Sequence, residues 1–263
     1  MSFTAKDVQA LRQLTGVGMM DAKKALEASE GDMGAATQWL RVQGIASAAK
    51  LAQRVAGEGA VAVVRDGHVA AIVELRCETD FVAKSDEFVA LADEIAVRVC
   101  AEGEAAAGLF SESFERMLAR LRENISLGRV VRLEGSPGDA VDTYNHFQAG
   151  RGVNAVAVVV SNASDEMAHD LAVHIAFAKP MYLHREDVPA SEVDAERATV
   201  EEITKNEGKP AAAVPKIVEG RLNGWFKERV LVEQPYVKDE KVTVAQFLGG
   251  ATIRAFAQVV VGG

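Results

Sequence analysis

The chain has 263 residues, of which 49% are apolar and 25% are charged, a composition typical of globular proteins. Its net charge of −9 repels phosphate backbones, so we expect no direct binding to nucleic acid, and a protein partner is favoured. No segment reaches the roughly 20 apolar residues that a membrane span requires, and the first residues lack the layout of a signal peptide. The composition therefore predicts a cytoplasmic protein without membrane contact.

Residues 3–44 carry three segments of helical periodicity separated by glycines. Thr4 is placed to cap the first segment, Gly16-Val17-Gly18 separates it from Met19–Ala28, and Asp32 is placed to cap the third. Three helices in so short a stretch predict a small bundle with a modest core, which is typical of a docking module.

An alanine-rich helix over 45–56 is expected to link this bundle to the rest of the chain. The next segment, Val61–Val73, has Asp66-Gly67 between two apolar runs. This pattern predicts a β-hairpin in which both turn residues adopt positive φ. The second strand passes into a helical pattern near Val82, and a further amphipathic helix is predicted over Phe114–Ile125.

The second half of the chain repeats this order of elements. A strand around Tyr144, a turn at Gly150-Arg151-Gly152, a strand over Val153–Val160 and a helix from Asp165 are predicted. Four apolar helix positions match at an offset of 80 residues: Leu91 and Leu171, Ala92 and Ala172, Ile95 and Ile175, Ala96 and Ala176. The shared order and spacing predict a duplicated hairpin-plus-helix unit.

Between about 190 and 234 the pattern changes to two long helices. Glu192–Glu207 is helix-favouring, Gly208-Lys209-Pro210 breaks it, and Pro215 opens a return helix. The pair is either a solvated surface element or a protruding contact arm, and the apolar bulk of Trp225 and Phe226 favours the arm. The chain then closes with a short helix over 244–248 and a strand over 253–261.

These elements predict an α+β fold. A three-helix bundle with its linker helix occupies residues 1–55, and the two halves of a duplicated core occupy 56–138 and 139–263. The second half includes the helical hairpin at about 190–234. In each half we expect an antiparallel sheet covered by helices on one side.

Patterns typical of catalysis or of cofactor binding are absent from the sequence. None of the five histidines lies in H-E-x-x-H, and His169 and His174 are spaced to face different sides of a helix. The glycines form no dinucleotide loop or phosphate loop, and Cys77 and Cys100 form no metal spacing. We therefore expect no catalytic residue, metal or cofactor, and two free thiols, although a disulfide between the cysteines stays open.

The segment from Cys77 to Lys84 joins a strand to a helix and carries an aromatic residue at the corner. Thr79 or Asp80 can cap the helix through its side-chain oxygen. Phe81 is then either a staple packed back onto the helix or a side chain presented for entry into a partner. Met19 and Met20 leave a similar choice between core filling and an adaptable contact surface.

With these residues in place, the chain resembles the bacterial elongation factor Ts family, the nucleotide exchange factors of elongation factor Tu. The resemblance covers nearly the whole length and rests on three segments in order: Leu14–Leu26, Thr79–Lys84 and Ile217–Arg221. It implies that the bundle is similar to a ubiquitin-associated (UBA-like) module, and that the helical hairpin is similar to the family's coiled coil. Longer members add a C-terminal helical module, whose contacts are not expected here.

The resemblance also implies the contact residues. Thr79, Asp80, Phe81 and Val82 correspond to the segment that enters beside the partner's magnesium and phosphate site. Other partner contacts correspond to Met19, Met20, Lys23, Asn124, Ile125 and His146.

The function implied is exchange: binding to elongation factor Tu with GDP and promotion of GDP release, without covalent chemistry. A non-exchanging interaction or chaperone-like module for a translational GTPase is the main alternative, and a carboxylate-dependent hydrolase is a weaker one. Assembly as a homodimer, or as a 2:2 complex with the GTPase, stays open.

Overall fold

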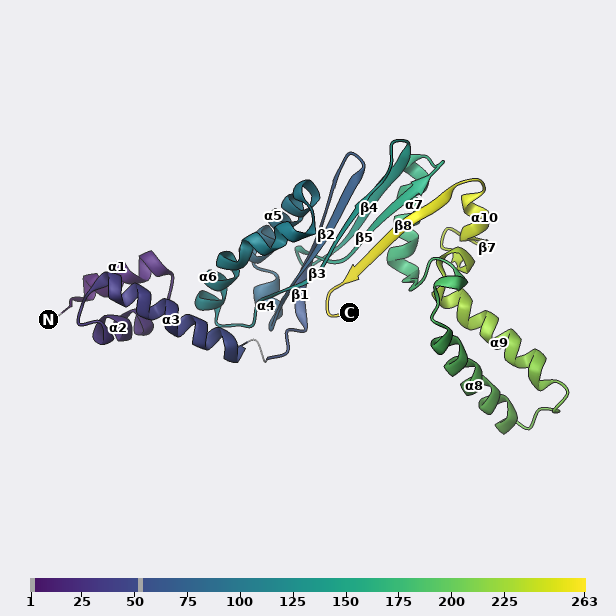
Figure 1. Cartoon of the computed structure of the whole chain (residues 1–263), viewed down its shortest axis with the longest axis horizontal. Helices are drawn as coiled ribbons and strands as arrows, with labels where there is room; N and C mark the ends of the chain where they lie inside the picture. Colours follow the sequence, from purple (N-terminus) through teal and green to yellow (C-terminus); the bar gives the residue numbers. More distant parts are fainter. Residues whose placement is uncertain (1–2, 52–53) are drawn as a thin grey trace.

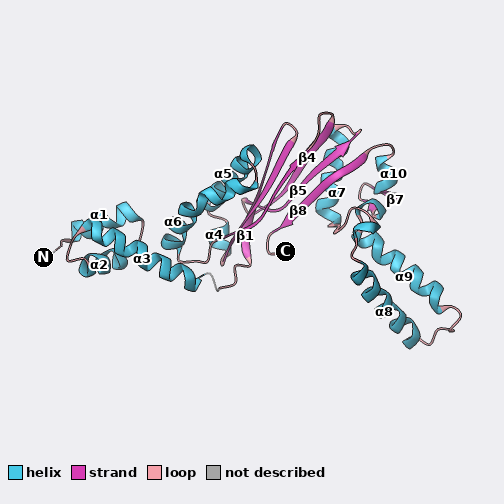
Figure 2. Ribbon diagram, viewed as in Figure 1, coloured by secondary structure: helices cyan, strands magenta, loops and turns pink. Residues whose placement is uncertain are grey.

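The computed structural model describes residues 3–51 and 54–263, and the side chains of 44–51 are outside the description. The molecule is elongated, with a helical bundle at one end, a core of sheets and helices in the middle, and a helical hairpin projecting from the other end (Figures 1 and 2). Within the described ranges no helix combines the length and the apolar character needed to cross a membrane. The predicted α+β fold is confirmed.

The N-terminal bundle consists of α1 (Ala5–Thr15), α2 (Met19–Ala28) and α3 (Met33–Leu51). Thr4 caps α1 in a reciprocal arrangement with Asp7, as its sequence predicts. The third helix and the linker helix are one element that ends at Leu51, whereas the prediction extended the linker helix to residue 56. Residues 52–53 of that prediction lie outside the described residues, and residues 54–57 are not helical.

The first half of the core is a three-stranded antiparallel sheet with helices on one face. Its strands are β1 (Glu58–Asp66), β2 (Val69–Cys77) and β3 (Ser126–Glu134), in the order β1-β2-β3. The connection from β2 to β3 contains α4 (Asp80–Ala83), α5 (Asp86–Glu102), the 3-10 helix η1 (Glu104–Phe110) and α6 (Ser111–Leu121).

The turn of the first hairpin lies one residue later than predicted. Asp66 pairs with Val69, so Gly67 and His68 form the turn, and of these only Gly67 has a positive φ, at 55°. A positive φ at the first turn position alone is the pattern of a type II′ turn, whereas the prediction assumed two such residues.

Two predictions for the segment after α5 were wrong. The helix expected over Phe114–Ile125 ends at Leu121, because Arg122 adopts a left-handed conformation with φ 58° and terminates it. Strand β3 was not predicted, because Gly128 and several charged residues interrupt its apolar positions. The glycine leaves room for the buried Glu74 of β2, whose carboxylate would meet an added Cβ.

The second half of the core repeats the architecture of the first. Its strands are β4 (Asp139–Gln148), β5 (Arg151–Ser161) and β8 (Thr252–Val260), in the order β4-β5-β8, and its covering helix is α7 (Asp165–Ala178). Ala149 and Gly150, with φ of 52° and 81°, form the hairpin turn, so Arg151 and Gly152 lie in β5 and not in the predicted turn.

The duplication is confirmed by this shared order, in which the third strand of each sheet pairs with the second. The eight helix positions matched in the sequence are all buried. The predicted division of the chain at residues 55 and 138 stays a prediction; residues 54–57 and 135–138 belong to no helix or strand.

The two sheets pack face to face, an arrangement that the sequence analysis did not predict. Val61 and Ile72 of the first sheet share a buried cluster with Ala157 and Val159 of the second. The helix α5 covers the outer face of the first sheet and α7 covers that of the second, so the core has four layers (Figure 1). The sheets approach so closely at Gly152 that an added Cβ would lie 2.2 Å from the carbonyl oxygen of Val61.

The helical hairpin consists of α8 (Ala190–Asn206) and α9 (Val214–Arg229), as predicted. It projects from the core as an arm, but the reason given for the arm was wrong (Figure 1). Phe226 is buried at the base of the arm among Val188 and Val230, and the guanidinium of Arg185 lies 4.3 Å from its ring centroid. The aromatic residues therefore attach the hairpin to the core and do not contribute apolar surface along the arm.

The remaining elements connect the hairpin to the last strand. The short helix α10 (Val244–Leu248) is as predicted. The sequence analysis did not predict four smaller elements: η2 (Arg185–Asp187), η3 (Leu231–Glu233), β6 (Pro235–Tyr236) and β7 (Asp239–Thr243).

A buried histidine joins α7 to the segment after the hairpin. The Nδ1 of His174 accepts a hydrogen bond from the main-chain N–H of Val237 at 3.2 Å, and its Nε2 lies 3.1 Å from Oε1 of Gln234. The amide of Gln234 donates in turn to the carbonyls of Ala178 and Glu228. Because Nδ1 accepts, the ring is neutral with its proton on Nε2, and burial lowers the pKa of His174.

This histidine predicts a loss of stability in mild acid. The unfolded chain protonates His174 near its ordinary pKa of 6.5, whereas the folded chain does so only at a lower pH. The stability gained from the neutral ring is complete above pH 6.5 and is lost as the pH falls through the lowered folded pKa. Thermal melts from pH 7.5 to 5 should show a larger drop in melting temperature for the wild type than for His174→Gln. Equal drops would contradict the assignment.

Two glycine-to-alanine changes, one where the sheets approach closely and one on the open surface of α9, are predicted to have opposite effects on stability. Gly152→Ala should lower the free energy of unfolding by about 1–3 kcal/mol, because the methyl group forces the sheets apart. Gly220→Ala, in the middle of α9 with nothing within 4 Å of the added Cβ, should raise it by roughly 0.5–1 kcal/mol. Urea denaturation of both variants measures the difference, and a neutral Gly152→Ala would contradict the packing.

Candidate functional site

The corner between β2 and α5 (residues 77–84) presents an aromatic side chain to solvent. Thr79 caps α4 by accepting a hydrogen bond from the N–H of Val82 at 3.4 Å, so Thr79 and not Asp80 is the cap. Val82 and Ala83 are buried. Phe81, the residue directly before them, has 84% of its surface exposed. The staple interpretation of Phe81 is therefore wrong.

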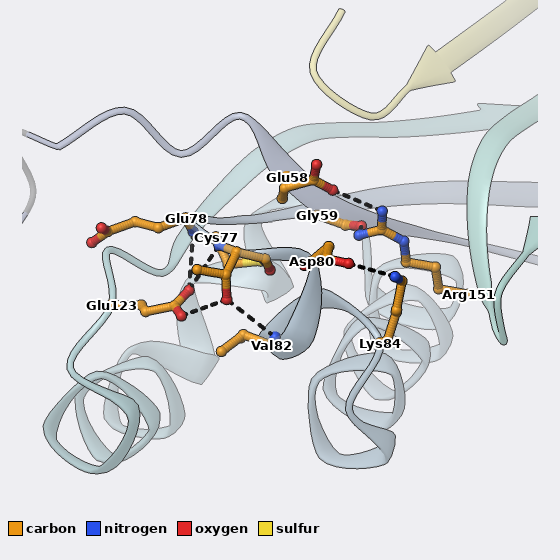
Figure 3. A network of polar contacts seen from close by, with 10 residues as sticks. Glu58, Gly59, Cys77, Glu78, Asp80, Val82, Lys84, Glu123 and Arg151 are labelled. Atoms are coloured by element: carbon orange, nitrogen blue, oxygen red, sulfur yellow. Dashed lines mark hydrogen bonds and ion pairs between the residues drawn. The ribbon is translucent and has the colours of Figure 1, made fainter.

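The carboxylate of Glu123 holds the beginning of the corner. It accepts hydrogen bonds from the N–H groups of Glu78 (3.2 Å) and Thr79 (3.0 Å) and from the hydroxyl of Thr79 (2.6 Å), as Figure 3 shows. Below the corner, the thiol of Cys77 donates to the carbonyl of Thr79 at 3.2 Å, and burial raises the pKa of Cys77 to about 12. Both cysteines are free and buried, as predicted, and this one is unreactive at neutral pH.

Charged groups surround the other side of the corner. The ammonium of Lys84 lies 2.5 Å from Asp80, and this hydrogen bond holds the pKa of Asp80 below its ordinary value. Beside them, Arg151 at the start of β5 bonds to Glu58 at 2.7 Å and to the carbonyl of Gly59 at 2.6 Å (Figure 3). The second half of the core thus contributes a cation next to a corner built by the first half.

A groove of about 720 Å³ extends from this ion pair across the second half. Its polar lining includes Glu58, His146, Arg151 and Lys179, and its apolar lining includes Phe177, which is 76% exposed. The predicted contact residue His146 is exposed and lies on this groove. The Glu58–Arg151 pair therefore borders both the corner and the groove that contains His146.

The three residues predicted in the bundle lie on the exposed face of α2. Met19 is 46% and Met20 is 64% exposed, so the core-filling interpretation of these methionines is wrong. Lys23 is also exposed and lies 3.7 Å from Glu27 one turn along the helix. These residues belong to the N-terminal bundle, which joins the core through α3 and also contacts it, since Asp21 of α2 pairs with Arg122 and α3 packs on α6 (Figure 1).

Asn124 and Ile125 are turned into the protein. Ile125 packs in the core beneath α5, and Asn124 donates from its side chain to the carbonyl of Arg54 and from its main chain to Glu78, both at 2.7 Å. At 8% and 5% exposed, the two residues support the corner from inside and offer a partner little side-chain surface.

Sequence reasoning missed Glu123 and Arg151. The predicted helix over Phe114–Ile125 placed Glu123 within a helix, where no contact with a strand end was expected. The available signal was its position directly before Asn124 and Ile125, which the family resemblance had marked. Arg151 was assigned to a turn, and only the face-to-face packing of the sheets brings it to the corner.

No described cluster of three or more histidine, cysteine, aspartate or glutamate side chains is arranged to hold a metal ion. His174 is buried, whereas His169 is exposed and lies 2.8 Å from Asp142, so the two histidines face different surroundings as predicted. The lining of the 720 Å³ groove contains one carboxylate, Glu58, which is already paired with Arg151.

The chain is similar to known proteins over its whole length. A family model described as elongation factor TS matches residues 78–263. Proteins named elongation factor Ts from Clavibacter michiganensis subsp. michiganensis and Kineococcus radiotolerans are each 44% identical to it. The first alignment covers 99% of both chains, and the second covers 96% of this chain and 95% of its relative.

This chain belongs to the elongation factor Ts family. The resemblance drawn from its three sequence segments is thereby confirmed, and family membership supports a role in translation elongation. In this elongation factor Ts family member the predicted contact residues Phe81, His146 and Met20 lie exposed at the corner, on the groove and on α2, respectively.

The exposure of Phe81 predicts that its side chain contributes little to folding. Phe81→Ala should change the free energy of unfolding by less than about 0.5 kcal/mol. Phe88→Ala, seven positions later and fully buried, should cost about 3–5 kcal/mol. Urea denaturation compares the two, and a loss above about 1 kcal/mol for Phe81→Ala would restore the staple interpretation.

Proposed function

We propose that this protein is a guanine nucleotide exchange factor that binds elongation factor Tu with GDP and accelerates GDP release. In this proposal Phe81 enters the GTPase beside its magnesium and phosphate site. The observation that carries the proposal is an aromatic residue that is 84% exposed on a hydrogen-bonded corner, in a chain of this family.

Exchange requires differential binding and no covalent chemistry. An exchange protein that binds the empty GTPase more tightly than the GDP-bound form lowers the affinity of the GTPase for GDP by the same ratio. Each tenfold loss of GDP affinity corresponds to about 1.4 kcal/mol. Burying an exposed phenylalanine contributes about 1.5–3 kcal/mol. If Phe81 is buried only in the nucleotide-free complex, this side chain alone accounts for roughly 10- to 100-fold weakening of GDP.

The proposed target is sensitive to small displacements. Magnesium requires nearly ideal octahedral geometry. An aromatic side chain that shifts one segment carrying a magnesium ligand therefore weakens the binding of the ion and of the phosphates that the ion holds. Asp80 brings a carboxylate to the same place, and its contact with Lys84 keeps it ionised. In this proposal Asp80 acts by its charge and position and need not bind the ion.

The other surfaces supply affinity. We assign the exposed face of α2, with Met19, Met20 and Lys23, to a second contact with the same GTPase, for which the flexible methionine side chains are suited. The groove with His146 extends the contact from the corner. Because the bundle and the core are covalently joined, binding of one raises the effective concentration of the other at the GTPase.

The proposal extends to organisation and location. The bundle, resembling a UBA-like module, and the two core halves act as separate contact units, and the protein works in the cytoplasm, where elongation takes place. The single paired carboxylate of the groove gives no support to a hydrolase.

The proposal predicts a specific loss of exchange on truncating the aromatic side chain. In stopped-flow measurements with fluorescent GDP on elongation factor Tu, the wild type should accelerate release, and Phe81→Ala should lower the accelerated rate roughly 10- to 100-fold. Leu109→Ala, which truncates a 69% exposed apolar residue on η1, is the matched control and should behave as the wild type.

Two outcomes would contradict the proposal. Binding of the wild type to the GTPase without faster release would identify a non-exchanging interaction module. Full activity of Phe81→Ala would remove the assigned role from this residue even if the wild type is active.

A further inference from the structure

Two loops that are distant in sequence hold each other through two carboxylates. The carboxylate of Glu123 accepts three hydrogen bonds from Glu78 and Thr79, and in return Oε1 of Glu78 accepts one from the N–H of Asn124 at 2.7 Å. The residues in contact are 44 to 46 positions apart. This reciprocal pairing ties the end of β2 to the loop between α6 and β3.

The contact with Glu123 determines what the hydroxyl of Thr79 can do. A threonine hydroxyl has one proton to donate, and here that proton goes to Glu123 at 2.6 Å. The oxygen is then oriented to accept from the N–H of Val82, which is the bond that caps α4. The cap therefore depends on a carboxylate from another loop.

The helix that carries Phe81 cannot hold this geometry alone. It has four residues, Asp80–Ala83, far fewer than an isolated helix needs for stability in water. Burial of Val82 and Ala83 fixes its inner side, and the Thr79 cap fixes its beginning. Phe81, on the outer side, takes its direction from these two supports.

We propose that Glu123 is the positioning residue for Phe81: it sets the Thr79 cap and so holds the aromatic ring in the direction required for nucleotide exchange. Glu123 acts through Thr79 and makes no contact with the partner. This inference rests on the proposed exchange function and adds to it the residue that orients its central side chain.

A carboxylate suits this position better than an amide of the same size. Three donors converge on Glu123, and an ionised carboxylate is a pure acceptor with two oxygens. Glutamine has one acceptor oxygen, and if that oxygen keeps the two N–H groups, its NH₂ group faces the Thr79 hydroxyl and has to donate to it. Glu123→Gln therefore removes the charge and releases the hydroxyl proton of Thr79 from residue 123, with little change in volume.

The first measurement uses the free, full-length protein. Amide hydrogen exchange over residues 78–83 should be about tenfold faster or more in Glu123→Gln than in the wild type, since these N–H groups lose charged acceptors or the cap. Glu115→Gln, the same change at an exposed carboxylate on α6, is the control and should leave this segment unchanged.

The second measurement is GDP release from elongation factor Tu at saturating exchange factor. Glu123→Gln should lower the accelerated rate about tenfold, and the same change in a Phe81→Ala background should have no further effect, because both act through one side chain. Thr79→Val, which removes the hydroxyl that Glu123 holds, should slow release as much as Glu123→Gln does, and Thr79→Ser, which keeps this hydroxyl, should be clearly faster than Thr79→Val. This threonine pair also decides the matter if Glu123→Gln does not fold, and equal rates for the two threonine variants would overturn the inference.

The outcomes separate this inference from the proposed function. Unchanged amide exchange, unchanged release, or additive effects of Glu123→Gln and Phe81→Ala would each overturn the positioning role while the wild type remains an exchange factor. A wild type that does not accelerate release would instead overturn the proposed function and, with it, the inference.

Discussion

The hydrogen bonds between Glu123 and the corner are the constraint on which the exposed aromatic residue depends. An apolar side chain surrounded by water has no preferred orientation. The four-residue helix α4 adds almost no stability of its own. The direction of Phe81 must therefore come from contacts beneath it, namely the buried Val82 and the Thr79 cap held by Glu123. The α6–β3 loop is as much a part of the site as the corner itself.

The duplicated core explains why residues of both halves meet at this site. Because the two sheets pack face to face, the start of β5 lies against the start of β1, and the close approach at Gly152 leaves no room for a side chain there. Arg151, the residue before Gly152, then reaches Glu58 and Gly59 beside the corner. A repeat that places one half on the other thus builds a continuous surface from the corner to the groove.

Much of the fold was predictable because short stretches of sequence determine these helices and hairpins. The hairpins and the helices α5 and α7 follow from apolar periodicity, and the helical hairpin follows from its Gly-Lys-Pro break. Strand β3 and the end of α6 were missed, since a left-handed Arg122 has no strong sequence signal. The residue pattern left the exposure of Phe81 open and only the family resemblance implied it. Its dependence on Glu123 could not be predicted, because it rests on contacts between segments 44 residues apart.

The central claim is that Phe81 enters the GTPase when GDP leaves. Photo-crosslinking from p-benzoylphenylalanine at position 81 tests it directly, with elongation factor Tu either empty or supplied with excess GDP. The account predicts crosslinks to the nucleotide-binding domain near the magnesium and phosphate site, with a yield that falls as GDP is added. A complex that forms without crosslinks, or a yield that GDP does not change, would contradict it.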